Sequence, residues 1–362
     1  MDGAQQTCRA DRHEKSGAGT DHTERSRYLR VSDNSEVLHV LLVTFPFFAL
    51  VLAGYLAARR GMLRLDAIPG LNSFVLYFAL PCLLYRFGST TPVAQLFDPA
   101  IFLTYLLCAL VLVGFVVAVS MNHRIGWNDA AFGALVAAFP NTGFMGVPLL
   151  VVLLGPLAAG PVIATIMVDM LVTSSLCVAL SRLDGAGLHG VSVAARNAMR
   201  GVLVNPMPWA ILLGALASWR GFTLPGPVNQ TILLLADAAS PVALFTIGAV
   251  LARSQMVSVA GPPRSIPLRD YVPVAMIKLV LHPALVLLVG IGAIQLGVTI
   301  DRFALTVIVL VAALPSASNV SLLAERFGAD TGRIARIILV STAAAFLTFS
   351  AAVTVLVGRQ PG

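Results

Sequence analysis

Long apolar segments separated by short polar ones run along almost the whole chain. Ten of them hold roughly 20 residues each, the length that an α-helix needs to cross a bilayer. None alternates apolar and polar residues with the period of two typical of strands, so we expect helices whose backbone groups are paired internally. The predicted spans are 37–58, 68–87, 98–120, 129–154, 160–182, 202–219, 228–252, 271–297, 302–324 and 334–357.

The composition agrees with a membrane protein surrounded by lipid. Hydrophobic residues make up 57% and charged residues 11% of the chain, and the mean hydropathy is +0.87. A soluble globular domain carries about 25% charged residues. The net charge of +7 comes from arginines in the loops, so it does not indicate a nucleic-acid partner. The four cysteines are isolated and lack metal-ligand or redox spacing.

The distribution of arginines among the loops predicts how the chain is oriented in the membrane. Thirteen lie in or beside the odd-numbered loops, and four lie in the even-numbered loops and the C-terminus. The positive-inside rule places the richer loops in the cytoplasm, so both termini are expected outside a plasma or inner membrane. The polar segment 1–36 carries six more basic residues, which opposes this orientation mildly. We expect it to be a disordered tail. The alternative is that the start codon has been assigned too early and that the protein begins near Val31 or Val37.

The two halves of the chain repeat each other. When the first half is shifted by 160 residues without gaps, its prolines and glycines meet those of the second half. Because these residues punctuate structure, a repeat is favoured over chance similarity between apolar segments. Five spans in each half, 37–182 and 202–358 around a short cytoplasmic loop at 183–201, make the repeat inverted. The matched pairs include Pro46–Pro206, Gly54–Gly214, Pro81–Pro241 and Gly88–Gly248.

One six-residue phrase occurs in each half. Leu-Val-Ala-Ala-Phe-Pro at 135–140 returns as Leu-Val-Ala-Ala-Leu-Pro at 310–315. A proline inside a span removes a backbone donor and clashes with the preceding turn, so we expect both helices to break there. Unwound backbone is tolerated in a bilayer only inside protein or beside a water-filled cavity. Broken helices at corresponding positions of two halves therefore predict a transporter's binding site.

Polar residues follow both prolines. A half-helix that begins after a break presents free N–H groups and the positive end of its dipole, which suits an anion. Side-chain amides and hydroxyls add neutral donors and acceptors, and Gly143 lets the backbone approach a ligand closely. The alternative is two ordinary kinks in which Ser and Asn join neighbouring helices. The candidate substrate-binding residues are Asn141, Thr142, Gly143, Ser316, Ser318 and Asn319.

Four stretches together resemble the auxin efflux carrier family, which includes the plant PIN auxin exporters and bacterial permeases of the malonate-transporter type. The resemblance covers about 37–357. The stretches are Asn-Thr-Gly-Phe-Met-Gly-Val-Pro at 141–148, Pro-Val-Ala-Leu-Phe-Thr-Ile-Gly at 241–248, Lys-Leu-Val-Leu-His-Pro at 278–283, and Pro-Ser-Ala-Ser-Asn at 315–319 with Ala324 and Gly328.

The resemblance implies ten spans in a 5+5 inverted repeat whose fourth and ninth spans cross at Pro140 and Pro315. It implies an organic carboxylate substrate, malonate-like or another mono- or dicarboxylate, bound near these prolines by the amides of Asn141 and Asn319. It also implies an elevator motion against a scaffold of spans 1, 2, 6 and 7. The central loop is too short for the regulated segment of the plant members, which puts plant-type phosphoregulation in doubt.

Four ionisable residues lie inside predicted spans: Asp169, Asp237, Lys278 and His282. Charge there is costly and usually faces a partner or a cavity. Lys278 and His282 are four residues apart and share a helix face. Lys278 could attract the anion, pair with either aspartate, or extend to the membrane surface. His282 is a candidate for proton coupling because imidazole titrates near neutral pH, or a packing residue.

The sequence excludes several classes of protein. It has no His-Glu-x-x-His, no Gly-x-Ser-x-Gly and no Walker-type glycine loop, so we expect neither an enzyme nor an ATPase, and no cofactor or metal. A sodium-coupled symporter of the bile-acid type and a non-transporting carboxylate sensor stay open as alternatives. A sodium site is disfavoured because 130–160 and 303–324 contain no acidic residue. A homodimer is left open.

Overall fold

The computed structural model describes residues 21–182, 196, 203–260 and 266–357. Within these ranges the fold is all-helical, with isolated β-bridges and no strands. Seven helices are long and apolar enough to cross a membrane, so the chain is a multi-pass membrane protein. They span Val40–Arg59, Ile68–Thr90, Val93–Ser120, Pro156–Leu180, Gly226–Met256, Val272–Gln295 and Thr331–Val357.

The first half of the chain forms α1 to α9. Three π-helical turns and one 3₁₀ turn interrupt or join these helices. In chain order the elements are α1 (Asp21–Arg59), α2 (Ile68–Phe74), η1 (Val75–Ala79), α3 (Leu80–Thr90), α4 (Val93–Leu96), α5 (Pro99–Ser120), α6 (Trp127–Ala138), η2 (Thr142–Gly146), α7 (Val147–Leu154), η3 (Pro156–Ala158), α8 (Ala159–Val168), η4 (Asp169–Thr173) and α9 (Ser174–Leu180).

The second half forms α11 to α17. It contains one 3₁₀ turn and one π-helical turn, both close to α13. In chain order the elements are α11 (Pro206–Arg220), α12 (Gly226–Ala260), η5 (Leu268–Asp270), α13 (Val272–Met276), η6 (Ile277–Leu281), α14 (His282–Gln295), α15 (Arg302–Ala313), α16 (Val320–Arg326) and α17 (Thr331–Val357).

Helices occupy all ten predicted segments, but three of these lack an unbroken helix of spanning length. Segments 129–154 and 302–324 are divided at their prolines. In segment 202–219 the 15-residue α11 begins at Pro206, where the Asn205 side chain caps it by accepting a hydrogen bond from the Met207 amide at 3.0 Å.

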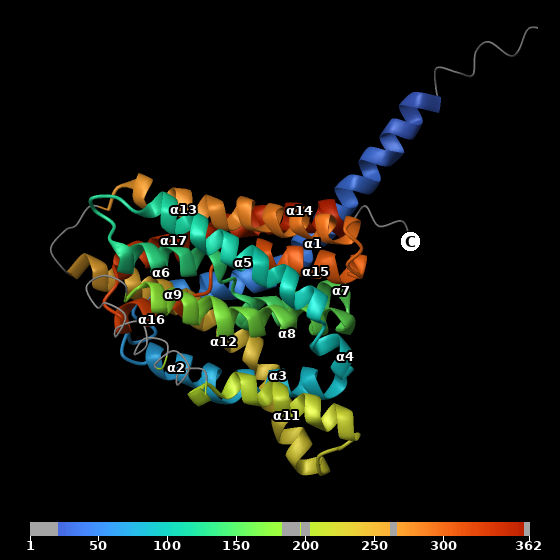
Figure 1. Cartoon of the computed structure of the whole chain (residues 1–362), viewed down its shortest axis with the longest axis horizontal. Helices are drawn as coiled ribbons and strands as arrows, with labels where there is room; N and C mark the ends of the chain where they lie inside the picture. The colour runs from blue at the N-terminus through green and yellow to red at the C-terminus, as the bar shows by residue number, and fades with distance from the viewer. Residues whose placement is uncertain (1–20, 183–195, 197–202, 261–265, 358–362) are drawn as a thin grey trace, which may run out of the picture.

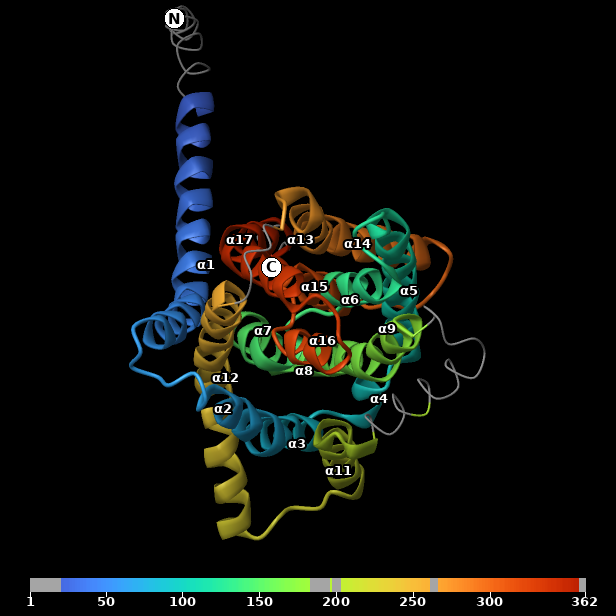
Figure 2. The ribbon, with the colours of Figure 1, turned by 90° about the vertical axis from the view of Figure 1, so that its left-hand side faces the viewer.

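The first helix begins earlier than expected. α1 starts at Asp21, inside the segment 1–36 predicted to be a disordered tail, and its first turns extend away from the other helices (Figures 1 and 2). Residues 21–36 contain neither proline nor glycine, so nothing in them stops a helix that continues from the span. Residues 1–20 and most of the loop 183–201 lie outside the described residues.

The helices form two groups. α1, α2, α3, α11 and α12 line the left and lower sides of Figure 2, and the remaining helices fill the opposite part. Within the first group, α1 packs on α12, and α3 packs on both α11 and α12. Within the second group, α5 contacts α6 and α14, and α14 contacts α15. α17 touches α1 and α12, so it joins the two groups.

Glycines allow the closest helix crossings in the first group. A Cβ atom added to Gly54 would overlap the backbone carbonyl of Phe245, and one added to Gly248 would overlap that of Val51. Where α3 and α11 cross, a Cβ on Gly214 would lie 2.7 Å from the carbonyl oxygen of Tyr85. Small residues that let two backbones approach closely are typical of helix contacts in membranes.

The centre of the second group is made by α6 and α15. Every residue from 130 to 138, and every residue from 307 to 313, is buried. A helix that is apolar on all sides belongs in the core of a large protein. These two helices run directly into the predicted breaks, so the broken ends lie deep inside the protein.

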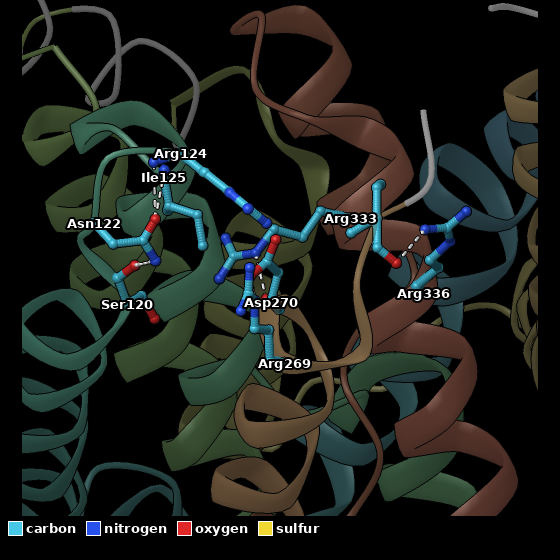
Figure 3. Close-up of polar contacts among 9 residues, drawn as sticks. Ser120, Asn122, Arg124, Ile125, Arg269, Asp270, Arg333 and Arg336 are labelled. Carbon is cyan, nitrogen blue, oxygen red and sulfur yellow. Dashed lines mark hydrogen bonds and ion pairs between the residues drawn. The ribbon is translucent and has the colours of Figure 1, made fainter. Parts of the chain in front are cut away.

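Three odd-numbered loops come together at one end of the molecule. Figure 3 shows Arg124, Arg269 of η5, and Arg333 and Arg336 of the start of α17 gathered there, although these three segments are far apart in the sequence. Arg333 is 2% exposed and donates from Nε to the carbonyl of Asp270 at 2.7 Å and from Nη1 to the carbonyl of Asp129 in the first turn of α6 at 2.8 Å. This end therefore combines basic side chains with a buried arginine that holds the loops together.

Candidate functional site

Both predicted helix breaks are present. α6 and α15 each end two residues before the proline, at Pro140 and Pro315, and helical turns resume in η2 and α16. Between these elements the two extended segments pass each other, with an antiparallel bridge between Pro140 and Ser316. The two breaks therefore meet at one place inside the protein.

The crossing segments satisfy each other's backbone groups. The Asn141 amide donates to the carbonyl of Pro315 at 2.8 Å, and the Ala317 amide donates to the carbonyl of Phe139 at 3.0 Å. An unpaired backbone group costs several kcal/mol where water is excluded. Because each break supplies a donor and an acceptor to the other, two interrupted helices are stable together where either alone would be costly.

A small cavity lies beside this crossing. Apolar side chains provide most of the walls, and amide, hydroxyl and carboxylate groups provide the rest. The lining residues are Phe139, Pro140, Asn141, Thr142, Gly143, Phe144, Ile166, Asp169, Met170, Met207, Ala317 and Asn319.

The lining includes much of the predicted site. Pro140, Asn141, Thr142, Gly143 and Asn319 all take part in it. The helix that runs from η2 into α7 begins at the cavity, so its positive dipole end faces the space. An anion placed there would meet a helix N-terminus and two side-chain amides.

Two polar atoms at the cavity have no partner within the described part of the chain. They are Oδ1 of Asn319 and Oδ2 of Asp169, both buried. Leaving such an atom unpaired costs about 1–3 kcal/mol, and native proteins satisfy nearly all of them. Two in one cavity wall indicate a place where a bound solute or a proton completes the hydrogen bonding.

The other predicted substrate-binding residues lie behind the cavity. Pro315, Ser316 and Ser318 are buried and are absent from the lining. Ser316 donates its backbone N–H to Oγ of Ser341 at 3.3 Å, and the carbonyl of Ser318 accepts from Oγ of Ser321 at 2.8 Å. Their contacts fix the position of the second break relative to α17 and α16.

Three of the four predicted intramembrane ionisable residues form one buried group. Lys278 donates from Nζ to the Ala312 carbonyl at 2.8 Å and lies 2.9 Å from Nδ1 of His282. Asp169 interacts electrostatically with Lys278 and accepts a hydrogen bond from Oγ1 of Thr173 at 3.3 Å. Lys278 and His282 are fully buried outside the cavity lining, whereas Asp169 reaches it.

The fourth ionisable residue lies elsewhere. Asp237 on α12 accepts a hydrogen bond from Nη1 of Arg86 on α3 at 2.7 Å. The two side chains are 69% and 41% exposed in the isolated chain and are not part of the cavity. This pair joins two helices of the first group, and the structure does not bring it to the crossing.

Several residues near the cavity were not found from the sequence. Met170 and Met207 line it, and Tyr105 is fully buried on α5 with its ring centroid 5.9 Å from that of His282. Tyr105 is a single tyrosine within an apolar span, so its polar hydroxyl was a signal that could have found it. The methionines carry no such signal because they resemble any other apolar residue of a span.

The described residues contain no group of three or more His, Cys, Asp or Glu side chains that could hold a metal ion. The site is instead an apolar cavity with a few neutral polar groups, one carboxylate and a helix N-terminus. Such an arrangement has the chemical groups to hold a small polar or anionic solute by hydrogen bonds.

The family model described as "Membrane transport protein" matches residues 39–188 and 191–353. Three known proteins are similar over most of their length. A "Putative malonate transporter" of Rhizobium meliloti is 31% identical over 302 residues, covering 83% of this chain and 90% of that protein. The "Uncharacterized transporter YfdV" of Escherichia coli is 26% identical, covering 79% and 88%. "Auxin efflux carrier component 8" of Arabidopsis thaliana is 24% identical, covering 77% and 87%.

Proposed function

This chain belongs to the auxin efflux carrier family of membrane transport proteins, and we propose that it carries a small organic carboxylate anion across the plasma or inner membrane. It is a transporter and not an enzyme. The observation that carries the proposal is the cavity beside the two paired helix breaks. Asn141 and Asn319, one from each break, line this cavity together with the start of the η2–α7 helix.

The chemistry of the cavity favours a carboxylate. Side-chain amides and a helix N-terminus donate hydrogen bonds to carboxylate oxygens. The mostly apolar walls would surround the short carbon skeleton of such a solute. The relative from Rhizobium meliloti is named for malonate transport, which makes malonate the first probe to use.

We further propose ten spans in two inverted repeats that move as an elevator. The glycine crossings support this arrangement. Under the shift of 160 residues, Gly54 corresponds to Gly214 and Gly88 corresponds to Gly248. The crossing of α1 with α12 therefore corresponds to the crossing of α11 with α3, which is the relation expected of an inverted repeat. The first group of helices would form the scaffold, and the group that contains the cavity would move.

The proposal is tested by exchange in proteoliposomes. Vesicles loaded with unlabelled malonate are given labelled malonate outside, and uptake is compared among the wild type, Asn141→Ala and Asn319→Ala. A hydrogen bond to a charged group contributes about 1.5–3 kcal/mol, so each variant should lose roughly ten-fold or more in apparent affinity. Monocarboxylates and auxin as unlabelled competitors would then define the substrate class.

A matched control separates binding from folding. Asn229→Ala removes the same amide from an exposed position on α12, so exchange should stay at the wild-type rate. All variants should unfold at temperatures close to that of the wild type. If Asn141→Ala and Asn319→Ala both exchanged malonate as fast as the wild type, the assignment of the site to the crossing would be refuted.

A further inference from the structure

One carboxylate reaches the cavity that we assign to an anion. Asp169 is 1% exposed, its Oδ1 accepts from Thr173, and its Oδ2 has no partner among the described residues. A carboxylate substrate beside it would place two negative charges in a low-dielectric space, which is strongly unfavourable. One of the two groups must be neutralised when the substrate binds.

The surroundings of Asp169 include one basic side chain. The titratable groups that face it are Lys278 of η6, Tyr105 of α5 and Cys177 of α9. Lys278 is in turn faced by His282, which it contacts at 2.9 Å. When Lys278 is protonated and Asp169 is ionised, the pair is neutral, and an entering anion then adds one uncompensated negative charge.

Lys278 cannot readily leave this position to follow the substrate. Its ammonium donates to the Ala312 carbonyl, which belongs to the last turn of α15 before the second break. A cation at the C-terminus of a helix is favourable because it meets the negative end of the dipole. The contact with Nδ1 of His282 uses a second donor of the ammonium. Lys278 and His282 are therefore positioning residues.

The ionisable residues of this group have no ionisable counterpart in the other half of the repeat. At the shift of 175 residues that aligns the two proline phrases, Asp169, Lys278 and His282 correspond to Ala344, Leu103 and Leu107. Asp169 begins one π-helical turn, η4, and Lys278 lies in another, η6. Turns of this kind inside α-helices occur frequently at functional sites. The repeat partners do without charge at these positions, so the crossing itself does not require it.

We propose that the cavity takes up one proton together with each carboxylate, and that Asp169 is the proton acceptor. This inference rests on the proposed function. The proton comes from water on the side where the substrate enters and adds to Oδ2 of Asp169. It leaves to water on the other side after the substrate has dissociated. Transport is then proton symport, driven inward when the outside is more acidic.

Calorimetry of malonate binding to the purified protein tests the proton directly. The binding enthalpy is measured in buffers of different ionisation enthalpy, and its dependence on the buffer gives the number of protons taken up. The wild type should take up about one proton per malonate. Asp169→Asn should take up none, because its amide is neutral at every pH. Asp237→Asn is the matched control and should behave as the wild type, since Asp237 lies outside the cavity.

The outcomes are distinguishable. Malonate binding by the wild type without proton uptake would overturn the inference and leave the proposed function standing. Proton uptake that persists in Asp169→Asn would place the proton on the substrate and overturn the role of Asp169. Absence of exchange in vesicles, both of labelled malonate and of labelled monocarboxylates, would overturn the proposed function itself.

A second variant keeps the test informative if Asp169→Asn does not fold. Thr173→Val removes the hydroxyl that donates to Oδ1 of Asp169 while keeping the shape of the side chain. The pH at which proton uptake by the complex is half-maximal should then become more alkaline. An unchanged pH profile in Thr173→Val would contradict Asp169 as the acceptor.

Discussion

The crossing of α1 and α12 depends on Gly248, and replacing this glycine by alanine should destabilise the protein. The added Cβ would overlap the carbonyl oxygen of Val51 and lie 2.6 Å from the amide nitrogen of Tyr55. Both neighbours are backbone atoms, so no side chain can rotate away. Ordinary van der Waals contact begins near 3.4 Å, and the helices must therefore separate by about 0.8 Å or more.

The magnitude follows from the loss of contact along the crossing. A gap of 0.5–1 Å removes about a quarter to a half of the dispersion energy of each atom pair. Overpacking of this kind costs about 1–3 kcal/mol, and the upper value applies because backbone must move. At about 2 °C per kcal/mol for a chain of this size, the unfolding temperature should fall by about 6 °C.

Thermal unfolding of the purified protein, followed by tryptophan fluorescence, measures this effect. Gly114→Ala is the control, because a Cβ at that position on α5 meets no atom within 4 Å. The control should unfold at the wild-type temperature or slightly above it, since alanine favours a helix by about 1 kcal/mol over glycine. If Gly248→Ala were as stable as Gly114→Ala, the close crossing of α1 and α12 would be wrong.

Two further predictions concern the loops. Arg333→Met should lower the unfolding temperature by several degrees, because two charge-assisted hydrogen bonds of about 1.5–3 kcal/mol each are lost. Arg336→Met should lower the unfolding temperature less, since Arg336 is half-buried and donates to the Ile266 carbonyl at 3.1 Å. Equal decreases in the two variants would contradict the role of buried Arg333 in holding the loops together. Single cysteines introduced within 183–200 should react with thiol reagents only from the cytoplasmic side, and labelling from outside would reverse the proposed orientation.

The sequence predicted the helical spans and the two breaks because both follow from local chemistry. Apolar length marks a span, and a proline within it marks a break whatever the rest of the protein does. The same reasoning selected Asn141 and Asn319 as candidates, and both line the cavity beside the crossing. It placed Pro315, Ser316 and Ser318 at the substrate on equal terms, whereas the structure puts them behind the cavity wall.

The remaining features depend on contacts between distant parts of the chain. Nothing local shows that the Asn141 amide would pair with Pro315, or that Lys278 would reach Ala312 at the end of α15. The partner of Asp237 is likewise 151 residues away, at Arg86. The sequence indicated that these residues needed partners, and only the packing of the helices identifies which ones they have.

The hydrogen bonds that join the two breaks run between main-chain atoms, and this separates architecture from recognition. The bridge between the segments would survive exchange of most side chains that face the cavity. Ile166, Met170 and Met207, which line its walls, are therefore free to change with the solute. If the proposed site is correct, these three positions are the ones to change in order to alter the transported solute while the paired breaks stay intact.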